Sequence, residues 1–170
     1  MKVLLLGLTG AGKTTVAKNV ANKYNLNLIE ADDEVIKLNG GHWPNSEEII
    51  DRYFEVTNDK VMGLDNVLYI ISWLIPERIN EFYNKDFIII ELHADFNELL
   101  RRKISRDGVS DEEKKRFRKN YLGYVKDILS DKTKRMLTLS LDTTKLSSEE
   151  IMFKVNGAVA DKICLHTLRV

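Results

Sequence analysis

The sequence predicts an α/β protein in which about five parallel strands form one sheet with helices on both faces, and three observations support this. Five short runs rich in leucine, isoleucine and valine alternate with longer segments of helical periodicity. The short runs are apolar at successive positions, which is typical of parallel strands buried on both faces. A glycine-rich segment, residues 7–15, joins the first run to the first helical segment. The strands are expected at residues 2–6, 26–30, 66–72, 86–92 and 135–141.

Six helices are expected between and after these strands. Pro76 suits the first turn of the helix that follows the third strand. Asp95 with Glu98, and Ser147 with Glu150, have the spacing of a capping box, which marks the start of a helix. The helical segments are residues 13–24, 46–62, 76–84, 95–104, 111–129 and 147–163.

Length and composition describe an ordinary globular chain. Its 170 residues fit a single domain, and contents of 44% hydrophobic and 31% charged residues are usual for a folded protein. The 26 basic and 26 acidic side chains give a formal net charge of zero. Because this balance provides no general attraction to nucleic acid or to an anionic membrane, we expect neither as a partner.

The single cysteine and the apolar runs indicate a cellular location. Cys164 has no second cysteine with which to form a disulfide in the chain, which favours a reducing compartment. The apolar run after Met1 leads directly into the glycine-rich segment, so it does not resemble a removable leader. The next apolar stretch, residues 67–76, is far too short to span a membrane. We expect a cytoplasmic protein that is a monomer or a homodimer.

The glycine-rich segment has the pattern G-x-x-x-x-G-K-[ST], formed by Gly7, Gly12, Lys13 and Thr14 between a strand and a helix. Glycines let the loop curl so that its N–H groups point at phosphate oxygens, and the helix N-terminus adds a positive dipole end. Lys13 can reach the β- and γ-phosphates of ATP, and the Thr14 hydroxyl can bind Mg²⁺. The expected nucleotide contacts in this loop are Gly7, Thr9, Gly10, Ala11, Gly12, Lys13, Thr14 and Thr15.

Two adjacent acids follow the second strand. Because ligands of an open parallel sheet bind at the carboxyl ends of its strands, Asp32 and Asp33 are expected to face the glycine-rich loop. One acid, with Asp32 as the candidate, would hold Mg²⁺ through water, and the other would accept a proton from an attacking hydroxyl. The pattern does not decide which acid has which role. An Asx turn or a helix N-cap would also explain these aspartates.

Two classes of nucleotide hydrolase lack their usual signals here. A GTPase needs an Asn-Lys-x-Asp segment to read guanine, whereas residues 84–87 end in Phe87 and precede a strand. Motor ATPases place an acid at the end of an inner strand to help bind Mg²⁺, whereas the third strand ends in Ser72 and Trp73. These absences favour a different class of phosphate-loop protein.

Four segments, which together span nearly the whole chain, resemble the small phosphate-loop kinases. Residues 7–17 are similar to adenylylsulfate kinases, and residues 29–36 are similar to the Asp-x-Asp segment of shikimate kinases, where Asp33 matches the second acid. Residues 67–78 are similar to gluconate and adenylylsulfate kinases, and this resemblance implies substrate contacts for Ser72 and Arg78. Residues 141–150 resemble the turn that borders adenine, which implies contacts for Asp142 and Thr144.

The resemblance also implies a lid and an acceptor-binding segment. The lid would span residues 101–118, with Arg102 and Arg106 closing over ATP to neutralise charge on the transferring phosphoryl group. A solvated charged helix face is the alternative for these arginines. The acceptor-binding segment would span residues 39–62 and include Arg52, which could instead form a surface ion pair with Glu48 or Glu55.

The expected activity is therefore transfer of the γ-phosphate of Mg-ATP to a hydroxyl of a small metabolite, within one domain. ATP and the Mg²⁺ that accompanies it are the expected cofactors, since the three histidines form no metal-binding motif. A nucleoside monophosphate is the alternative acceptor, because its ionised phosphate needs arginines more than a base. A slowly hydrolysing regulatory module and a polynucleotide kinase are more remote alternatives.

Overall fold

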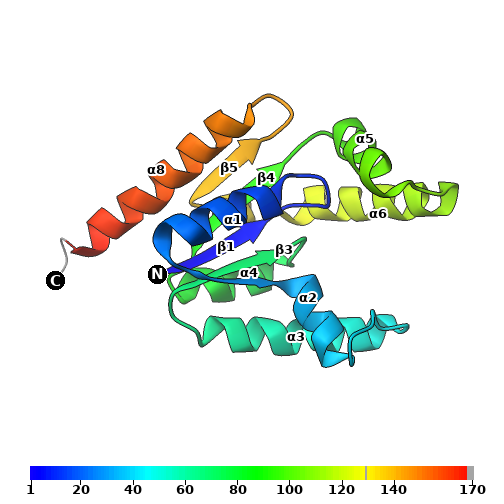
Figure 1. Ribbon diagram of the computed structural model, residues 1–170, viewed down its shortest axis with the longest axis horizontal. Helices are drawn as coiled ribbons and strands as arrows, with labels where there is room; N and C mark the ends of the chain where they lie inside the picture. Colours follow the sequence, from blue (N-terminus) through cyan, green and yellow to red (C-terminus); the bar gives the residue numbers. More distant parts are fainter. Residues whose placement is uncertain (129, 168–170) are drawn as a thin grey trace.

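The computed structural model describes residues 1–128 and 130–167 and contains the expected parallel sheet (Figure 1). All four strand pairings are parallel, in the order β2-β3-β1-β4-β5. The strands are β1 (Lys2–Leu6), β2 (Asn27–Glu30), β3 (Val67–Ile71), β4 (Ile88–His93) and β5 (Leu139–Asp142). The helices are α1 (Lys13–Tyr24), α2 (Ala31–Leu38), α3 (Glu47–Met62), α4 (Pro76–Asn84), α5 (Phe96–Asp107), α6 (Asp111–Ile128), α7 (Asp131–Lys134) and α8 (Ser148–Thr167).

The central strand, β1, is buried between β3 and β4. Leu4 is aligned with Tyr69 on one side and with Ile89 on the other, and none of the three has measurable exposure. This burial on both faces explains why the strand runs lack the polar alternation of a half-exposed sheet. The glycine-rich loop follows the carboxyl end of β1, so it begins directly at this buried central strand.

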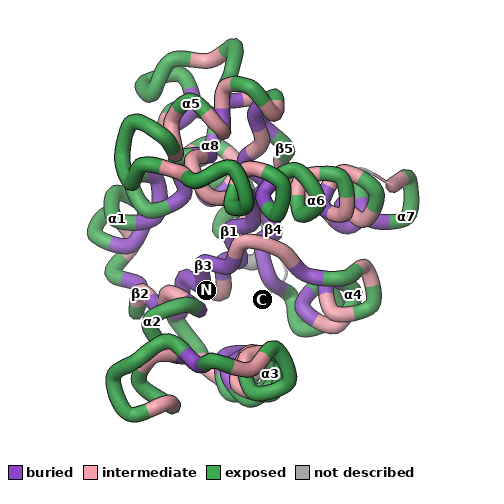
Figure 2. The backbone as a smooth tube through the Cα atoms, turned by 90° about the vertical axis from the view of Figure 1, so that its right-hand side faces the viewer, coloured by how far each residue is buried: buried purple, intermediate pink, exposed green. Residues whose placement is uncertain are grey.

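Helices cover both faces of the sheet, as expected. Viewed toward the carboxyl ends of the strands, α1 and α8 lie on one face, and α4, α6 and α7 lie on the other (Figure 2). Helix α1 buries Val16, Ala17, Val20 and Ala21, which is the apolar stripe that the periodicity of the segment predicts. Helices α2 and α3 pack together beside β2 and β3.

The predicted helix starts carry the expected caps. Asp95 Oδ1 accepts the Glu98 N–H at 2.9 Å. Ser147 and Glu150 form a reciprocal box, in which each side chain accepts the backbone N–H of the other residue. Pro76 is the first residue of α4. The last residue of the helix predicted over 111–129 lies outside the described residues.

Two short helices correct the predicted boundaries. Helix α2 begins immediately after β2, so Asp32 and Asp33 lie in its first turn, where neither caps it. Helix α7 and the turn after it delay the fifth strand, which begins at Leu139 and not at residue 135. Ser130 caps α7 by accepting the Thr133 N–H. The apolar pattern of residues 135–141 gave no indication of this capped helix, so the strand was predicted to begin too early. Within the described ranges, no helix is long and apolar enough to cross a membrane.

Candidate active site

The glycine-rich loop is held tightly against the sheet. Gly7 has a φ of +149°, and a Cβ there would lie 2.2 Å from the Leu92 carbonyl oxygen of β4, so no other residue fits. Gly7 lies outside the cavities beside the loop, and its role is this close approach. Gly12 has a φ of +91° and precedes α1, which directs the first N–H groups of that helix toward the loop.

Lys13 is the buried cation of the loop. Its side chain is 9% exposed, and Nζ donates to the Leu8 carbonyl oxygen at 3.4 Å. Burial lowers the pKa of Lys13 to about 8, and the nearby acids Asp32 and Glu30 oppose that change. The Lys13 ammonium is therefore held beside the loop by a carbonyl oxygen, which an oxygen of a bound phosphate can replace.

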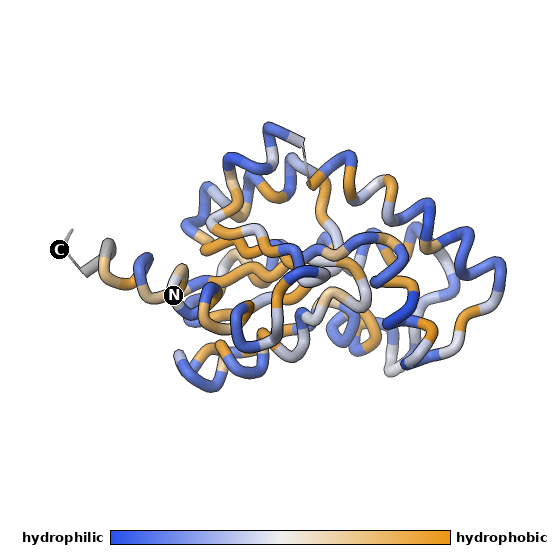
Figure 3. Tube along the Cα trace, turned by 90° about the horizontal axis from the view of Figure 1, so that it is seen from above, coloured by the Kyte–Doolittle hydropathy of each residue, from blue (hydrophilic) through white to orange (hydrophobic). Residues whose placement is uncertain are grey.

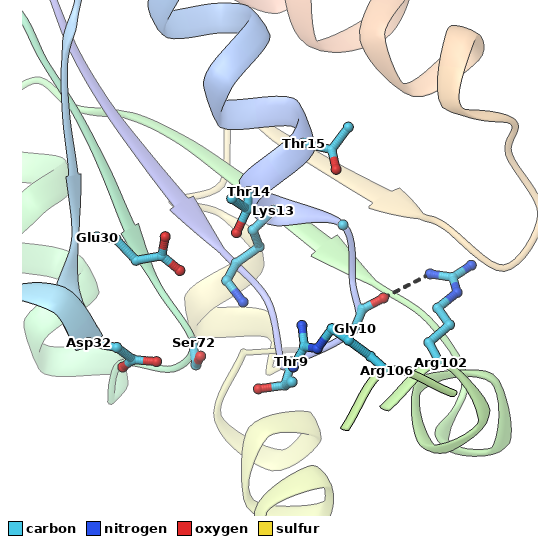
Figure 4. A pocket seen from close by; sticks show the side chains of 11 residues that line it. Thr9, Gly10, Lys13, Thr14, Thr15, Glu30, Asp32, Ser72, Arg102 and Arg106 are labelled. Carbon is cyan, nitrogen blue, oxygen red and sulfur yellow. Dashed lines mark hydrogen bonds between the residues drawn. The ribbon is translucent and has the colours of Figure 1, made fainter. Parts of the chain in front are cut away.

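A cavity of about 320 Å³ opens beside the loop. The charged groups are separated across the cavity (Figure 4). The acids Glu30 and Asp32 lie on one side, together with Ser72. Arg102 and Arg106 lie on the other side, and Lys13 lies between the two groups. The full lining is Thr9, Gly10, Gly12, Lys13, Thr14, Thr15, Glu30, Asp32, Ser72, Arg102 and Arg106.

The acids that line the cavity are Glu30 and Asp32, whereas Asp33 lies outside the lining. Loss of water raises the pKa of Asp32, against the effect of Lys13. Burial and then the neighbouring Asp33 and Asp32 raise the pKa of Glu30. Glu30 was not among the candidates predicted from sequence. Its position as the last residue of an edge strand is the signal that could have identified it.

Arg102 joins α5 to the glycine-rich loop. Its guanidinium donates to the Gly10 carbonyl oxygen at 3.0 Å, to the Thr143 hydroxyl at 3.0 Å and to the Thr143 carbonyl oxygen at 2.9 Å. Nε also donates to Glu98 at 2.7 Å. Arg106, one turn further along α5, is exposed and paired with Asp107 at 2.7 Å.

A second cavity of about 340 Å³ shares Gly10, Gly12, Thr15 and Arg102 with the first. It extends between the loop and the start of α8. The remaining lining is Ala11, Val16, Thr143, Leu146, Ser148, Ile151 and Met152. Its wall thus continues from the glycine-rich loop to an apolar patch on α8.

Asp142 and Thr144, predicted to contact the nucleotide, lie outside the lining of the second cavity. Asp142 accepts the Thr144 N–H at 3.0 Å, and the Thr144 hydroxyl accepts the Asp95 N–H at 3.0 Å. These bonds hold the turn that presents the buried Thr143 between them. Thr143 was not predicted from sequence, because its contact with Arg102 joins residues 41 apart.

The arginines predicted to bind substrate do not reach the first cavity. Arg78 bridges α3 and α4, where it pairs with Glu55, with Asp59 at 3.3 Å and with Glu81 at 2.5 Å. Arg52 is exposed on α3 and outside the lining. In the described structure, the carboxylate that the sequence offered to Arg52, Glu55, is therefore engaged by Arg78.

A buried polar network lies between the sheet and α6. The Glu91 carboxylate, with no exposure, accepts the Tyr124 hydroxyl at 2.5 Å and the Ser140 hydroxyl at 2.7 Å, and lies 2.7 Å from His93 Nδ1. Hydrogen bonding to Glu91 raises the pKa of His93. Glu91 and His93 are two residues apart on β4, so the strand pleat brings them to the same face, and this spacing is the signal that could have identified the partner of His93.

Sheet order, loop geometry and the position of the cavities place the chain in the P-loop class, with the fold of the small kinases. A shikimate kinase structure from Acinetobacter baumannii superposes with a TM-score of 0.72 over 94% of this chain and 93% of that chain, at 17% identity. This similarity shows the fold.

Sequence comparison gives relatives in two kinase groups. A shikimate kinase of Caldicellulosiruptor saccharolyticus is 30% identical over 59% of this chain and 62% of its own length, so the chain spans less than two thirds of that relative. A probable thymidylate kinase of Methanococcus maripaludis is 27% identical over 95% of this chain and 96% of its own length. A family model described as an AAA domain matches residues 3–129, more than half of the chain, and the chain belongs to that family. The resemblance to small P-loop kinases is confirmed.

Proposed function

We propose that the chain is an ATP-dependent phosphotransferase that moves the γ-phosphate of Mg-ATP to a hydroxyl of a small metabolite. The observation that supports this most directly is the cavity in which two acids, Glu30 and Asp32, face Lys13 beside the phosphate loop. A hydroxyl acceptor has a proton to lose, and a carboxylate of raised pKa is suited to receive it. Shikimate-like and gluconate-like hydroxyl compounds are the first acceptors to test.

The loop and the second cavity would hold the nucleotide. The loop N–H groups and Lys13 would bind the β- and γ-phosphates, since both lie at the N-terminus of α1. The nucleobase of ATP would occupy the second cavity, which runs from Gly10 to the apolar side chains of Ile151 and Met152. Arg102, which touches both the loop and Thr143, would fix the distance between these two sites.

The donor set fits Mg²⁺. The Thr14 hydroxyl and the carboxylates of Asp32 and Glu30 line one cavity, and Mg²⁺ prefers oxygen donors, of which it needs few besides water and phosphate. When bound, the ion neutralises part of the charge on the β- and γ-phosphates. We assign one acid of the Glu30/Asp32 pair to the ion and the other to the acceptor. Asp33, which lies outside the cavity lining, is left without either role.

One domain would contain both moving parts. Residues 101–118, which include Arg102 and Arg106, would be the lid, and residues 39–62 would form the acceptor side. Arg106 lines the cavity, and in the described part of the chain its guanidinium pairs with the exposed Asp107, so it can turn toward phosphate when the lid closes. A reducing, cytoplasmic location is supported by the single cysteine.

The test is ADP release from Mg-ATP across a panel of acceptors. The panel holds shikimate, gluconate, adenylylsulfate, nucleosides, nucleoside monophosphates and a 5′-hydroxyl oligonucleotide. We expect strong stimulation by one hydroxyl compound and its loss in Lys13→Ala. Hydrolysis that no acceptor changes would instead indicate a regulatory module. Stimulation by the oligonucleotide, with steep salt dependence, would indicate a polynucleotide kinase.

A nucleoside monophosphate is the second candidate acceptor. The observation in its favour is the similarity to probable thymidylate kinases over 95% of this chain. The absence of Arg52 and Arg78 from the cavity weighs against it, because an acceptor phosphate needs cations. Stimulation by thymidine monophosphate, together with little effect of Glu30→Gln, would establish this alternative.

A further inference from the structure

The outer side of β5 and the adjacent face of α8 enclose a hollow of about 590 Å³. Strand β5 is an edge strand that pairs only with β4, so its other edge faces this hollow. Helix α8 runs along that edge, and its C-terminal end extends past the sheet (Figures 1 and 3). The lining is Thr138, Leu139, Ser140 and Leu141 from the strand segment, with Phe153, Lys154, Gly157, Ala158, Asp161 and Lys162 from the helix. We name this lining the α8 face.

An aromatic side chain stands free on the α8 face. Phe153 is 81% exposed, whereas the other large exposed hydrophobic side chains described reach at most 60%, at Leu122. A fully burying contact for a phenylalanine contributes about 1.5–3 kcal/mol, which this chain alone does not obtain. Because Phe153 also lines the hollow, a partner seated there would cover its ring.

Packing in the described part of the chain does not require the glycine on the α8 face. Gly157 lies in the middle of α8, where glycine costs about 1 kcal/mol relative to alanine. A Cβ on Gly157 would meet nothing within 4 Å, so no neighbouring group in the described structure requires glycine there. Together with Ala158, it leaves room for another backbone to approach the helix closely.

The charges of the α8 face indicate which molecule binds there. We infer that the α8 face binds the same face of a second copy, with the two α8 helices antiparallel about a two-fold axis between Gly157 and Ala158. This arrangement puts Gly157 opposite the partner's Ala158 and Lys154 opposite the partner's Asp161. Phe153 then lies along the aliphatic stem of the partner's Lys162.

This pairing is self-complementary in shape and in charge. A two-fold axis requires each feature of the face to meet its counterpart, and the order Phe-Lys, Gly-Ala, Asp-Lys meets that requirement when read antiparallel. Within the described part of the chain, Asp161 and Lys162 form no ion pair, and Lys154 only lowers the pKa of Glu150 from a distance. The α8 face has ten residues, fewer than the roughly 20–30 residues per side of a standard interface, so the dimer should be weak and reversible.

Sedimentation velocity of the full chain over a wide concentration range tests this pairing. We expect a monomer–dimer equilibrium that Phe153→Ser weakens at least about tenfold, as loss of a central aromatic contact does. Leu122→Ser, which removes an exposed apolar side chain on α6, is the matched control and should change nothing. Circular dichroism would verify that the variants remain folded.

A charge exchange gives the decisive measurement. Lys154→Glu and Asp161→Lys should each weaken the dimer, and the double variant should restore it, because the exchanged pair is again opposite in charge. A chain that is monomeric at every concentration would overturn the inference. So would a dimer that Phe153→Ser and the charge exchange both leave unchanged, since such a dimer would use another surface.

Discussion

The Tyr124 hydroxyl donates a hydrogen bond to the Glu91 carboxylate at 2.5 Å, and both side chains are buried in the core. This bond joins α6, whose first half lies in the proposed lid segment 101–118, to β4, the strand that precedes α5. Burial and the neighbouring carboxylate raise the pKa of Tyr124, so the hydroxyl stays a donor. The chain before and after the proposed lid segment is therefore tied together at one buried carboxylate.

Loss of this donor should destabilise the protein. Tyr124→Phe leaves a buried carboxylate oxygen without its hydroxyl partner, and we expect the free energy of unfolding to fall by about 1.5–3 kcal/mol. Urea unfolding followed by circular dichroism measures the change. Tyr121→Phe, on the same helix but with its ring against Phe96, is the matched control and should stay within about 0.5 kcal/mol of the parent. Equal stability of the two variants would contradict the anchoring role.

The same network should make stability depend on pH. Glu91 raises the pKa of His93 above 6.5, so the protonated form is favoured in the folded protein. Its contribution is fully present below the unfolded pKa and is lost as pH rises through the higher folded pKa. We expect His93→Gln to reduce stability most below pH 6.5 and progressively less above it. Unfolding measured from acid to alkaline pH would test this, and a constant difference between parent and variant would contradict it.

The phosphate loop was predictable because its determinants are local. Gly7 to Thr14 form a continuous motif whose roles depend only on the strand before it and the helix after it. The strand order was not predicted, but the parallel sheet followed from apolar runs with no polar alternation. Local sequence patterns are therefore sufficient to predict the phosphate-loop side of the candidate site.

The acceptor side was less predictable because it depends on distant contacts and on one helix start. Helix α2 begins without a turn after β2, which leaves Glu30 and Asp32 in the cavity and Asp33 outside it. Arg78 pairs with Glu81 on its own helix and with Asp59 of α3, 19 residues earlier across β3. Glu91 and Tyr124 are 33 residues apart, and nothing in the pattern of either segment marks the pair.

Arg102 should control nucleotide affinity through geometry as well as charge. Arg102→Lys keeps the cation but loses the planar fork that contacts Gly10 and both oxygens of Thr143. We expect the KM for ATP to rise about tenfold or more, because each lost charged hydrogen bond is worth about 1.5–3 kcal/mol. Arg101→Lys is the matched control, since its guanidinium pairs with Glu98 alone. An unchanged KM in Arg102→Lys would contradict the positioning role.

Arg106 should act on the rate more than on binding. It lines the cavity and is exposed, so its charge reaches the phosphoryl group only when the lid closes. Arg106→Ala should lower kcat by about 10³ with a smaller change in the KM for ATP, since such a cation stabilises the transition state. Steady-state kinetics with the stimulating acceptor separates the two constants. A loss in KM with kcat retained would assign Arg106 to ground-state binding instead.

The three acids at the end of β2 and the start of α2, Glu30, Asp32 and Asp33, offer the sharpest test of the site. Glu30→Gln and Asp32→Asn each remove a charge that faces Lys13, and each should lower kcat by about 10²–10⁴, whereas Asp33→Asn should leave it nearly unchanged. The variant that also needs more Mg²⁺ for half-maximal turnover identifies the acid on the metal side, and the other acid is then the base. Because the three side chains are within four residues, they share one local fold, and Asp33→Asn controls for its disturbance. A large loss in Asp33→Asn with full activity in Glu30→Gln would mean that the acid outside the cavity moves in when substrate binds.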